Sequence, residues 1–216
     1  MHLNLAAIEK SLLTVQHDFH KINTTLLEPR SPMTDMVRNN MMEGYAFIDD
    51  LLSRGIELYE PGNASRLLEL NALVLCGSNA QVRRENQQHI RATHDHFYER
   101  QSGDIEDLLA WFHSHSDLSI WRQVAITYIL ILSQPQLYIE GNHRTGSLIM
   151  SYMLAKEGKP PFVLSIDNAK AFFDPSTLAK ETHKKGMTSL FKIPKLKVRF
   201  AKFLKKNSQA GYILKS

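Results

Sequence analysis

The chain has 216 residues, of which 43% are hydrophobic, so it is long enough for one domain with a sizeable core or for one core with appended segments. Its single cysteine, Cys76, excludes an internal disulfide, and the first ten residues lack the basic start and apolar centre of a secretory signal. The net charge of +4 conceals an uneven distribution, because ten lysines and arginines but no acidic residue follow Glu181. We expect a protein of a reducing compartment, located in the cytoplasm.

Apolar residues recur at helical spacing along most of the chain, which predicts an all-α fold. Six helices are expected, over residues 5–26, 45–58, 65–75, 105–113, 119–132 and 144–157. The apolar run within 124–132 is far short of the roughly 20 residues that span a bilayer, and it is typical of a buried helix. Turn-forming residues mark weak boundaries at 28–32, 61–63 and 159–161.

Between Ser78 and Gly103 the helical pattern gives way to polar residues, mainly glutamine, arginine, asparagine and histidine. Hydrophobic periodicity assigns no helix to this part of the chain. On the residues alone, the segment is expected to be a surface loop.

The most informative segment is 136–144, which reads Gln-Leu-Tyr-Ile-Glu-Gly-Asn-His-Arg. A helix is expected to begin at or just after Gly141, and unpaired N–H groups at a helix start attract anions. Asn142 can add a donor, Arg144 a forked cation for an outer phosphate, and Glu140 a hard oxygen ligand for Mg²⁺. The alternative is an ordinary Gly-Asn turn capped by the asparagine.

The basic C-terminal tail carries four apolar residues on one predicted helical face, namely Leu196, Phe200, Phe203 and Leu204. Such a helix could bind an anionic membrane or a nucleic acid through its lysines. The alternative is that the apolar face packs on its own domain and the lysines are solvated.

Segment 136–144 resembles the signature of the Fic/Doc family, His-x-Phe-x-(Asp/Glu)-Gly-Asn-(Gly/Lys)-Arg. Tyr138 stands at the aromatic position, Glu140 at the acidic one and Arg144 at the end, with matching spacing throughout. More loosely, the resemblance covers about 35–159. It implies a Fic-type helical bundle with a short β-hairpin flap between Ser78 and Gly103, near the active site, that holds a target segment.

The resemblance divides the chain into an N-terminal helical extension (1–34), a Fic-like core (35–159) and a C-terminal extension that ends in the basic tail (160–216). It also implies Mg²⁺ with ATP as ligand, an unidentified target protein as partner, and transfer of AMP to a hydroxyl of that target. Gly141 and Asn142 would then hold the α-phosphate and Arg144 the outer phosphates. The oligomeric state stays open, a homodimer included.

Gln136 departs from the family pattern, because it stands where the family has a catalytic histidine that accepts the proton of the target hydroxyl. An amide has no such basic site, and loss of a general base typically lowers a rate by roughly 10² to 10⁴-fold. We therefore expect nucleotide binding with impaired or altered catalysis. The alternative is a non-catalytic Fic-like regulatory or protein-interaction module. A third interpretation is that Gln136 is an introduced change at a position where the natural protein has histidine. The natural protein would then be an active enzyme.

Three further positions have alternative roles. Ser147 stands where many family members carry a second arginine, so this chain lacks the positive charge that the family has at that position. Glu43 lies in a segment similar to the family's inhibitory motif and would pair with Arg144; alternatively it is an ordinary acid at the start of a helix. His143 is expected to contact phosphate or face solvent rather than to act as a displaced base.

Overall fold

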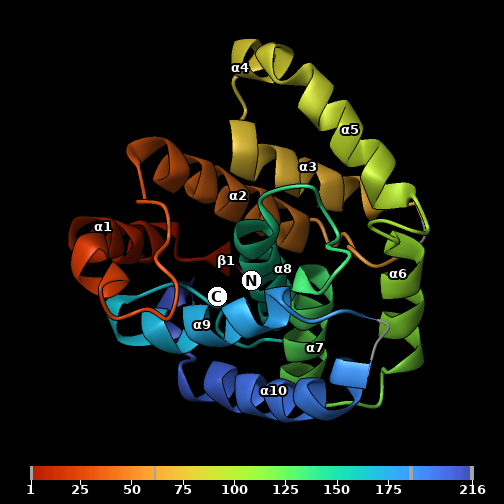
Figure 1. The fold of residues 1–216 in the computed structure, drawn as a ribbon. Helices are drawn as coiled ribbons and strands as arrows, with labels where there is room; N and C mark the ends of the chain where they lie inside the picture. The colour runs from red at the N-terminus through yellow and green to blue at the C-terminus, as the bar shows by residue number, and fades with distance from the viewer. Residues whose placement is uncertain (1, 61, 185–186, 215–216) are drawn as a thin grey trace.

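The computed structural model describes residues 2–60, 62–184 and 187–214, with the backbone alone for 187–193. Two short strands, β1 (His2–Leu3) and β2 (Ile213–Leu214), pair antiparallel, with His2 opposite Leu214. The helices follow in chain order as α1 Leu5–Asn23, α2 Asp35–Ser53, α3 Ala64–Cys76, α4 Ala80–Glu85, α5 Gln87–Tyr98, α6 Ile105–Ser114, α7 Ile120–Leu132, α8 Asn142–Lys156, α9 Ile166–Lys180 and α10 Met187–Lys206. The predicted all-α class is confirmed (Figure 1).

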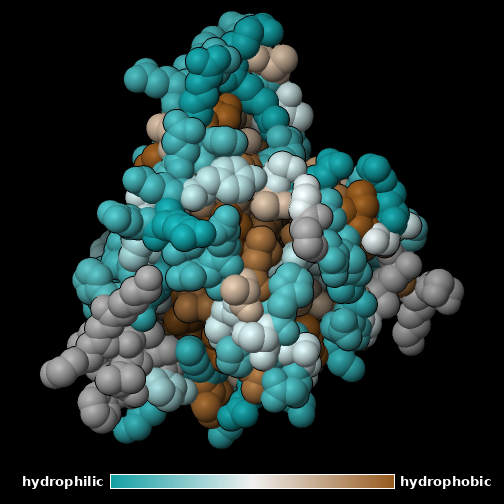
Figure 2. Space-filling model, turned by 90° about the vertical axis from the view of Figure 1, so that its right-hand side faces the viewer, coloured by the Kyte–Doolittle hydropathy of each residue, from teal (hydrophilic) through white to brown (hydrophobic). Residues whose placement is uncertain are grey.

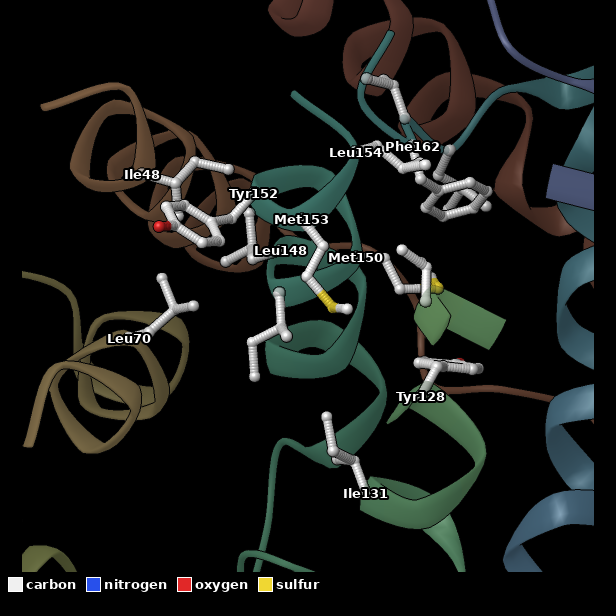
Figure 3. Packing of buried hydrophobic residues seen from close by; sticks show 14 of the residues in the cluster. Ile48, Leu70, Tyr128, Ile131, Leu148, Met150, Tyr152, Met153, Leu154 and Phe162 are labelled. Atoms are coloured by element: carbon white, nitrogen blue, oxygen red, sulfur yellow. The ribbon is translucent and has the colours of Figure 1, made fainter. Parts of the chain in front are cut away.

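Helix α8 is the centre of the fold. Every residue over 145–155 is buried, because α2, α3 and α7 pack around it. Figure 3 shows the neighbours that surround Leu148 and Met153 of α8: Ile48 from α2, Leu70 from α3 and Ile131 from α7. A helix that is covered on all sides cannot shift without disrupting the core, so its N-terminus is held in a fixed place.

Helix α2 begins well before the predicted start at residue 45. The hydroxyl of Thr34 accepts a hydrogen bond from the Val37 N–H at 3.2 Å and caps the helix at this point. Gly44 therefore lies inside α2, where a Cβ atom would overlap Leu148 of α8. The glycine lets the two helices approach closely.

The predicted hairpin flap is wrong, and so is the alternative of a plain loop. Residues 80–85 and 87–98 form α4 and α5, which project from the body of the molecule (Figure 1). Only Thr93 and Phe97 of these two helices are buried, so their apolar spacing was too sparse to reveal a helix. Figure 2, which views the molecule from the side of α5 and α6, shows mostly hydrophilic side chains in this upper part.

The segments expected as extensions belong to the same hydrophobic core as the rest. Phe19 from α1, Phe200 from α10 and Tyr212 near the C-terminus are members of one buried cluster. The ring of Phe200 stacks on Tyr128 of α7 at a centroid distance of 5.1 Å. The apolar face of the basic tail therefore packs on its own domain, as one of the two interpretations expected.

Several cations of that tail remain exposed, among them Lys202, Lys205 and Lys206. Lys185 and Lys215 lie outside the described residues, as does the side chain of Lys192. Within the part of the chain that the structure describes, no helix combines the length and the apolar character needed to cross a membrane.

Candidate functional site

The loop between α7 and α8 is folded around the side chain of Asn142. Its Nδ2 donates to the Tyr138 carbonyl at 2.7 Å, and its Oδ1 accepts from the Tyr138 N–H at 2.9 Å. The same Nδ2 donates to Oε1 of Gln136 at 3.3 Å. The amide is 4% exposed, so Asn142 shapes the loop from inside.

Neighbouring helices hold this loop from outside. The hydroxyl of Tyr138 donates to the Leu67 carbonyl of α3 at 3.1 Å, and its ring stacks on Phe97 of α5. Asn71 of α3 donates to the Glu140 carbonyl and to the Thr145 hydroxyl, both at 2.9 Å. Sequence reasoning missed Asn71, although a lone amide within the apolar run of α3 was a usable signal.

Gly141 is the N-cap of α8, with φ = 75°, which confirms the predicted helix start. This left-handed conformation favours glycine. A Cβ atom would also lie 3.0 Å from the Asn71 amide nitrogen and 3.2 Å from a methyl of Leu75. Both the backbone conformation and the packing therefore require a glycine where the loop becomes a helix.

A cavity of about 330 Å³ opens at the start of α8. It is walled by α1, α2, α9, the segment 30–33 and the segment 162–164. Most of its lining is apolar, and the basic side chains are Arg30, His143 and Arg144, whereas no acidic side chain lines it. The full lining is Leu12, Phe19, Arg30, Ser31, Pro32, Met33, Val37, Met41, Tyr45, Gly141, Asn142, His143, Arg144, Ser147, Phe162, Leu164, Phe172 and Phe173.

Arg144 connects this cavity with the end of α3. One guanidinium nitrogen, Nη1, donates to the Val74 carbonyl at 3.1 Å. Burial lowers the pKa of Arg144, while the negative charge of Glu140 opposes the shift. The side chain remains a cation at neutral pH, and no carboxylate of the described residues forms an ion pair with it.

His143 faces the cavity rather than solvent. Its Nδ1 is 3.2 Å from the Tyr128 hydroxyl, and its Nε2 is buried without a hydrogen-bond partner. Burial lowers the pKa of His143 to about 3, and the charges of Arg30 and Lys180 lower it further. The imidazole is therefore neutral at pH 7 in the ligand-free protein. It can still donate one neutral hydrogen bond.

Gln136 lies outside the lining of the cavity. Its Nε2 donates to the Leu132 carbonyl at 3.1 Å, while its Oε1 accepts from Asn142. Ser147 does line the cavity, and its hydroxyl donates to the Arg144 carbonyl at 2.7 Å. Both side chains contribute to the hydrogen bonding of the loop and the first turns of α8.

Glu43 lies in the interior of α2, so its interpretation as an acid at a helix start is wrong. A Cβ atom at Gly77 would be 3.3 Å from its Oε2, which places the carboxylate beside the end of α3. That oxygen is buried without a hydrogen-bond partner. No hydrogen bond or ion pair joins Glu43 to Arg144, although both lie near the last turn of α3.

Glu140 is exposed, and its carboxylate makes no hydrogen bond or ion pair with the described residues. Among those residues, no three His, Cys, Asp or Glu side chains gather into a metal site. Mg²⁺ in phosphate-binding proteins is commonly held by one or two carboxylates together with phosphate oxygens. Glu140 has the oxygen ligands that this mode requires, but it does not line the cavity.

We predict that Gly141→Ala destabilises the fold by more than Gly55→Ala. Both glycines have positive φ, which costs an alanine roughly 1–2 kcal/mol, but only Gly141 has neighbours within 4 Å of the added methyl. The free energies of unfolding in urea measure the difference. Equal losses would contradict the close packing of Gly141 against α3.

The pKa of His143 also predicts a dependence of stability on pH. An unfolded histidine has a pKa of about 6.5, whereas the pKa of His143 in the fold is about 3. The unfolded state therefore binds more protons than the folded state between these two pH values. The free energy of unfolding should therefore fall from pH 6.5 towards pH 3, and less steeply in His143→Gln. His20→Gln, at an exposed position of α1, is the control. Equal slopes in the wild type and His143→Gln would show that the pKa of His143 is nearly the same in the folded and unfolded states.

No family model, no curated protein and no solved structure matches this chain. The resemblance to the Fic/Doc family therefore depends on the motif residues and on their arrangement at the start of α8.

Proposed function

We propose that the cavity at the start of α8 binds a nucleotide, with Mg²⁺ and ATP as ligand. The protein would be a Fic-like relative of transferases that move AMP to a protein hydroxyl, with catalysis impaired because Gln136 replaces the base. One observation carries the proposal: the cavity meets the N-terminus of a buried helix, and its lining contains arginines but no acidic side chain.

The electrostatics of the cavity favour an anion. The first N–H groups of a helix have no partner within the helix, and the helix dipole places partial positive charge there. Arg144 adds a full charge beside them. Because α8 is buried, these charges act in a medium of lower dielectric constant than water, which strengthens their attraction for phosphate.

The apolar part of the lining suits the rest of a nucleotide. Phe19, Phe172 and Phe173 lie on the walls of the same cavity, and aromatic rings provide stacking partners for a flat base. A volume of about 330 Å³ is within the range of small-molecule pockets. An anionic head with a flat, apolar body is the ligand chemistry that this lining recognises.

Within this proposal the motif residues have the following roles, although Glu140 lies next to the cavity lining and not within it. Gly141 lets the backbone approach the α-phosphate, and Arg144 binds the outer phosphates. Glu140 would hold Mg²⁺, which neutralises phosphate charge when bound. Asn142 keeps the loop in shape, and His143 donates a single neutral hydrogen bond. These roles use the Asn142 amide inside the loop and the neutral form of the His143 imidazole.

Transfer of AMP would form a bond between the target hydroxyl oxygen and the α-phosphorus, break the bond to the bridging oxygen, and release pyrophosphate. The hydroxyl proton needs an acceptor, and the amide of Gln136 supplies no basic site. A non-catalytic module that binds nucleotide or a partner protein is the second candidate function. The hydrogen bonds from Gln136 to Leu132 and from Asn142 to Gln136 favour it, because they assign Gln136 a structural role.

We predict that Mg²⁺·ATP binds the wild type in calorimetric titration and that Arg144→Ala weakens binding about 10- to 100-fold, the usual effect of removing a charged hydrogen-bond partner. Arg54→Ala is the matched control, because Arg54 is exposed at the end of α2 and pairs with Asp50. No binding to the wild type or to Glu43→Gly, which removes the candidate inhibitory acid, would contradict nucleotide binding.

We also predict that Gln136→His gains transfer of AMP onto protein, by about 10²-fold or more over the wild type. Incorporation of labelled AMP from ATP into proteins of a cell extract measures it, with Gln136→His combined with Arg144→Ala as the inactive control. If nucleotide binds but neither protein transfers AMP, the non-catalytic alternative is favoured. Strong transfer by the wild type would show that Gln136 is compatible with catalysis.

A further inference from the structure

Arg30 lies outside the motif, in the segment between α1 and α2, yet it lines the same cavity as His143 and Arg144. Its backbone is clamped by Asn23: the Arg30 N–H donates to Asn23 Oδ1 at 2.6 Å, and Asn23 Nδ2 donates to the Arg30 carbonyl at 3.0 Å. These two hydrogen bonds to the Asn23 side chain fix the backbone of Arg30 and therefore the direction in which its side chain points.

The guanidinium of Arg30 is held by neutral groups. One nitrogen donates to the Thr177 hydroxyl of α9, and the group lies over the ring of Phe173 at 5.7 Å from its centroid. Its Nε is buried and has no hydrogen-bond partner. A guanidinium has five N–H donors, so the Thr177 hydroxyl occupies only part of its hydrogen-bonding capacity.

The positive charge of Arg30 is uncompensated within the described residues. No ion pair includes it, and its effect reaches His143, whose pKa it lowers. Asp174, a carboxylate of α9, accepts from the Leu27 N–H and from Lys170. A partly buried charge without an acidic partner and a buried Nε–H without an acceptor are both unfavourable, and an anion in the cavity would relieve both costs.

We propose that Arg30 is the second anion-binding cation of the cavity and acts together with Arg144. The Nε–H and the free guanidinium donors would bind oxygens of a ligand that carries more than one anionic group on an apolar or aromatic body. The identity of that ligand as a nucleoside diphosphate or triphosphate rests on the proposed function. The role of Arg30 in anion binding rests on its own geometry.

This assignment makes the segment before α2 part of the binding site. Residues 30–33 form one wall, and α1 contributes Leu12 and Phe19 to the lining. The hydrogen bonds from Arg30 to Thr177 and from Leu27 to Asp174 fix the same segment to α9. Ligand binding would therefore strengthen the attachment of the N-terminal segment to the body of the protein.

The test compares Arg30→Gln with the wild type in calorimetric titrations of ATP, ADP, AMP and inorganic pyrophosphate, all with Mg²⁺. Glutamine removes the charge and keeps a polar side chain. We expect about 10- to 100-fold weaker binding of ATP, ADP and pyrophosphate, and a smaller loss for AMP, which has a single phosphate. Arg54→Gln at the exposed end of α2 is the matched control and should bind as the wild type does.

Arg30→Lys keeps the charge but lacks Nε, so it should bind with intermediate affinity; it also replaces Arg30→Gln if that variant does not fold. Unchanged affinities in the Arg30 variants, with loss of binding in Arg144→Ala, would overturn the role of Arg30 and leave the proposed function standing. Binding of pyrophosphate but not of ATP, lost in Arg30→Gln, would support Arg30 and overturn the nucleotide assignment. No binding of any of these anions by the wild type would overturn both.

Discussion

The two hydrogen bonds between the Asn142 side chain and the Tyr138 backbone determine the shape of the site. They close the loop that precedes α8, so that Gly141 can start the helix and the two side chains after Asn142, those of His143 and Arg144, reach the cavity. An unpaired buried donor or acceptor typically costs about 1–3 kcal/mol, which penalises any other loop conformation. The motif residues 136–144 therefore have a structural role, whatever chemistry they support.

The core and the site are linked through the burial of α8. Packing by α2, α3 and α7 fixes the helix, and its N-terminus meets a cavity in which arginines lack acidic partners. Such an arrangement lowers the stability of the protein alone, because desolvated charges and unpaired donors are unfavourable. Proteins commonly tolerate local violations of this kind where a ligand binds.

Sequence patterns predicted the elements whose packing is reflected in their apolar spacing. Helices α3, α6, α7 and α8 lie close to their predicted positions: the buried residues of α3 recur every three or four positions, whereas α7 and α8 are apolar runs that are buried on nearly all sides. Helix α5 was missed because only Thr93 and Phe97 are buried on it, and α9 because it contains Pro175, which argues against a helix interior. The start of α2 was predicted too late, because the helix begins at the Thr34 cap and its first turns show no clear apolar periodicity.

The helix start at Gly141 and the place of Arg144 in the first turn were identifiable from the motif, because both follow from local chain geometry. The place of Arg30 in the cavity lining and the burial of His143 were not, because both depend on residues distant in the sequence, such as Thr177 and Tyr128. Local patterns specify a helix start, whereas the charge balance of a cavity emerges only when segments from the whole chain meet.

The short ladder between β1 and β2 has a consequence for how the chain reaches this state. It joins the two ends of the described chain, and Asn4 Nδ2 also donates to the Gly211 carbonyl across 207 positions. Only a few hydrogen bonds offset the entropy of closing so long a loop, so we expect the ends to pair after the helices have docked. Because α1 follows β1 directly and carries Leu12 and Phe19 of the cavity wall, we expect opening of the ladder to loosen that wall.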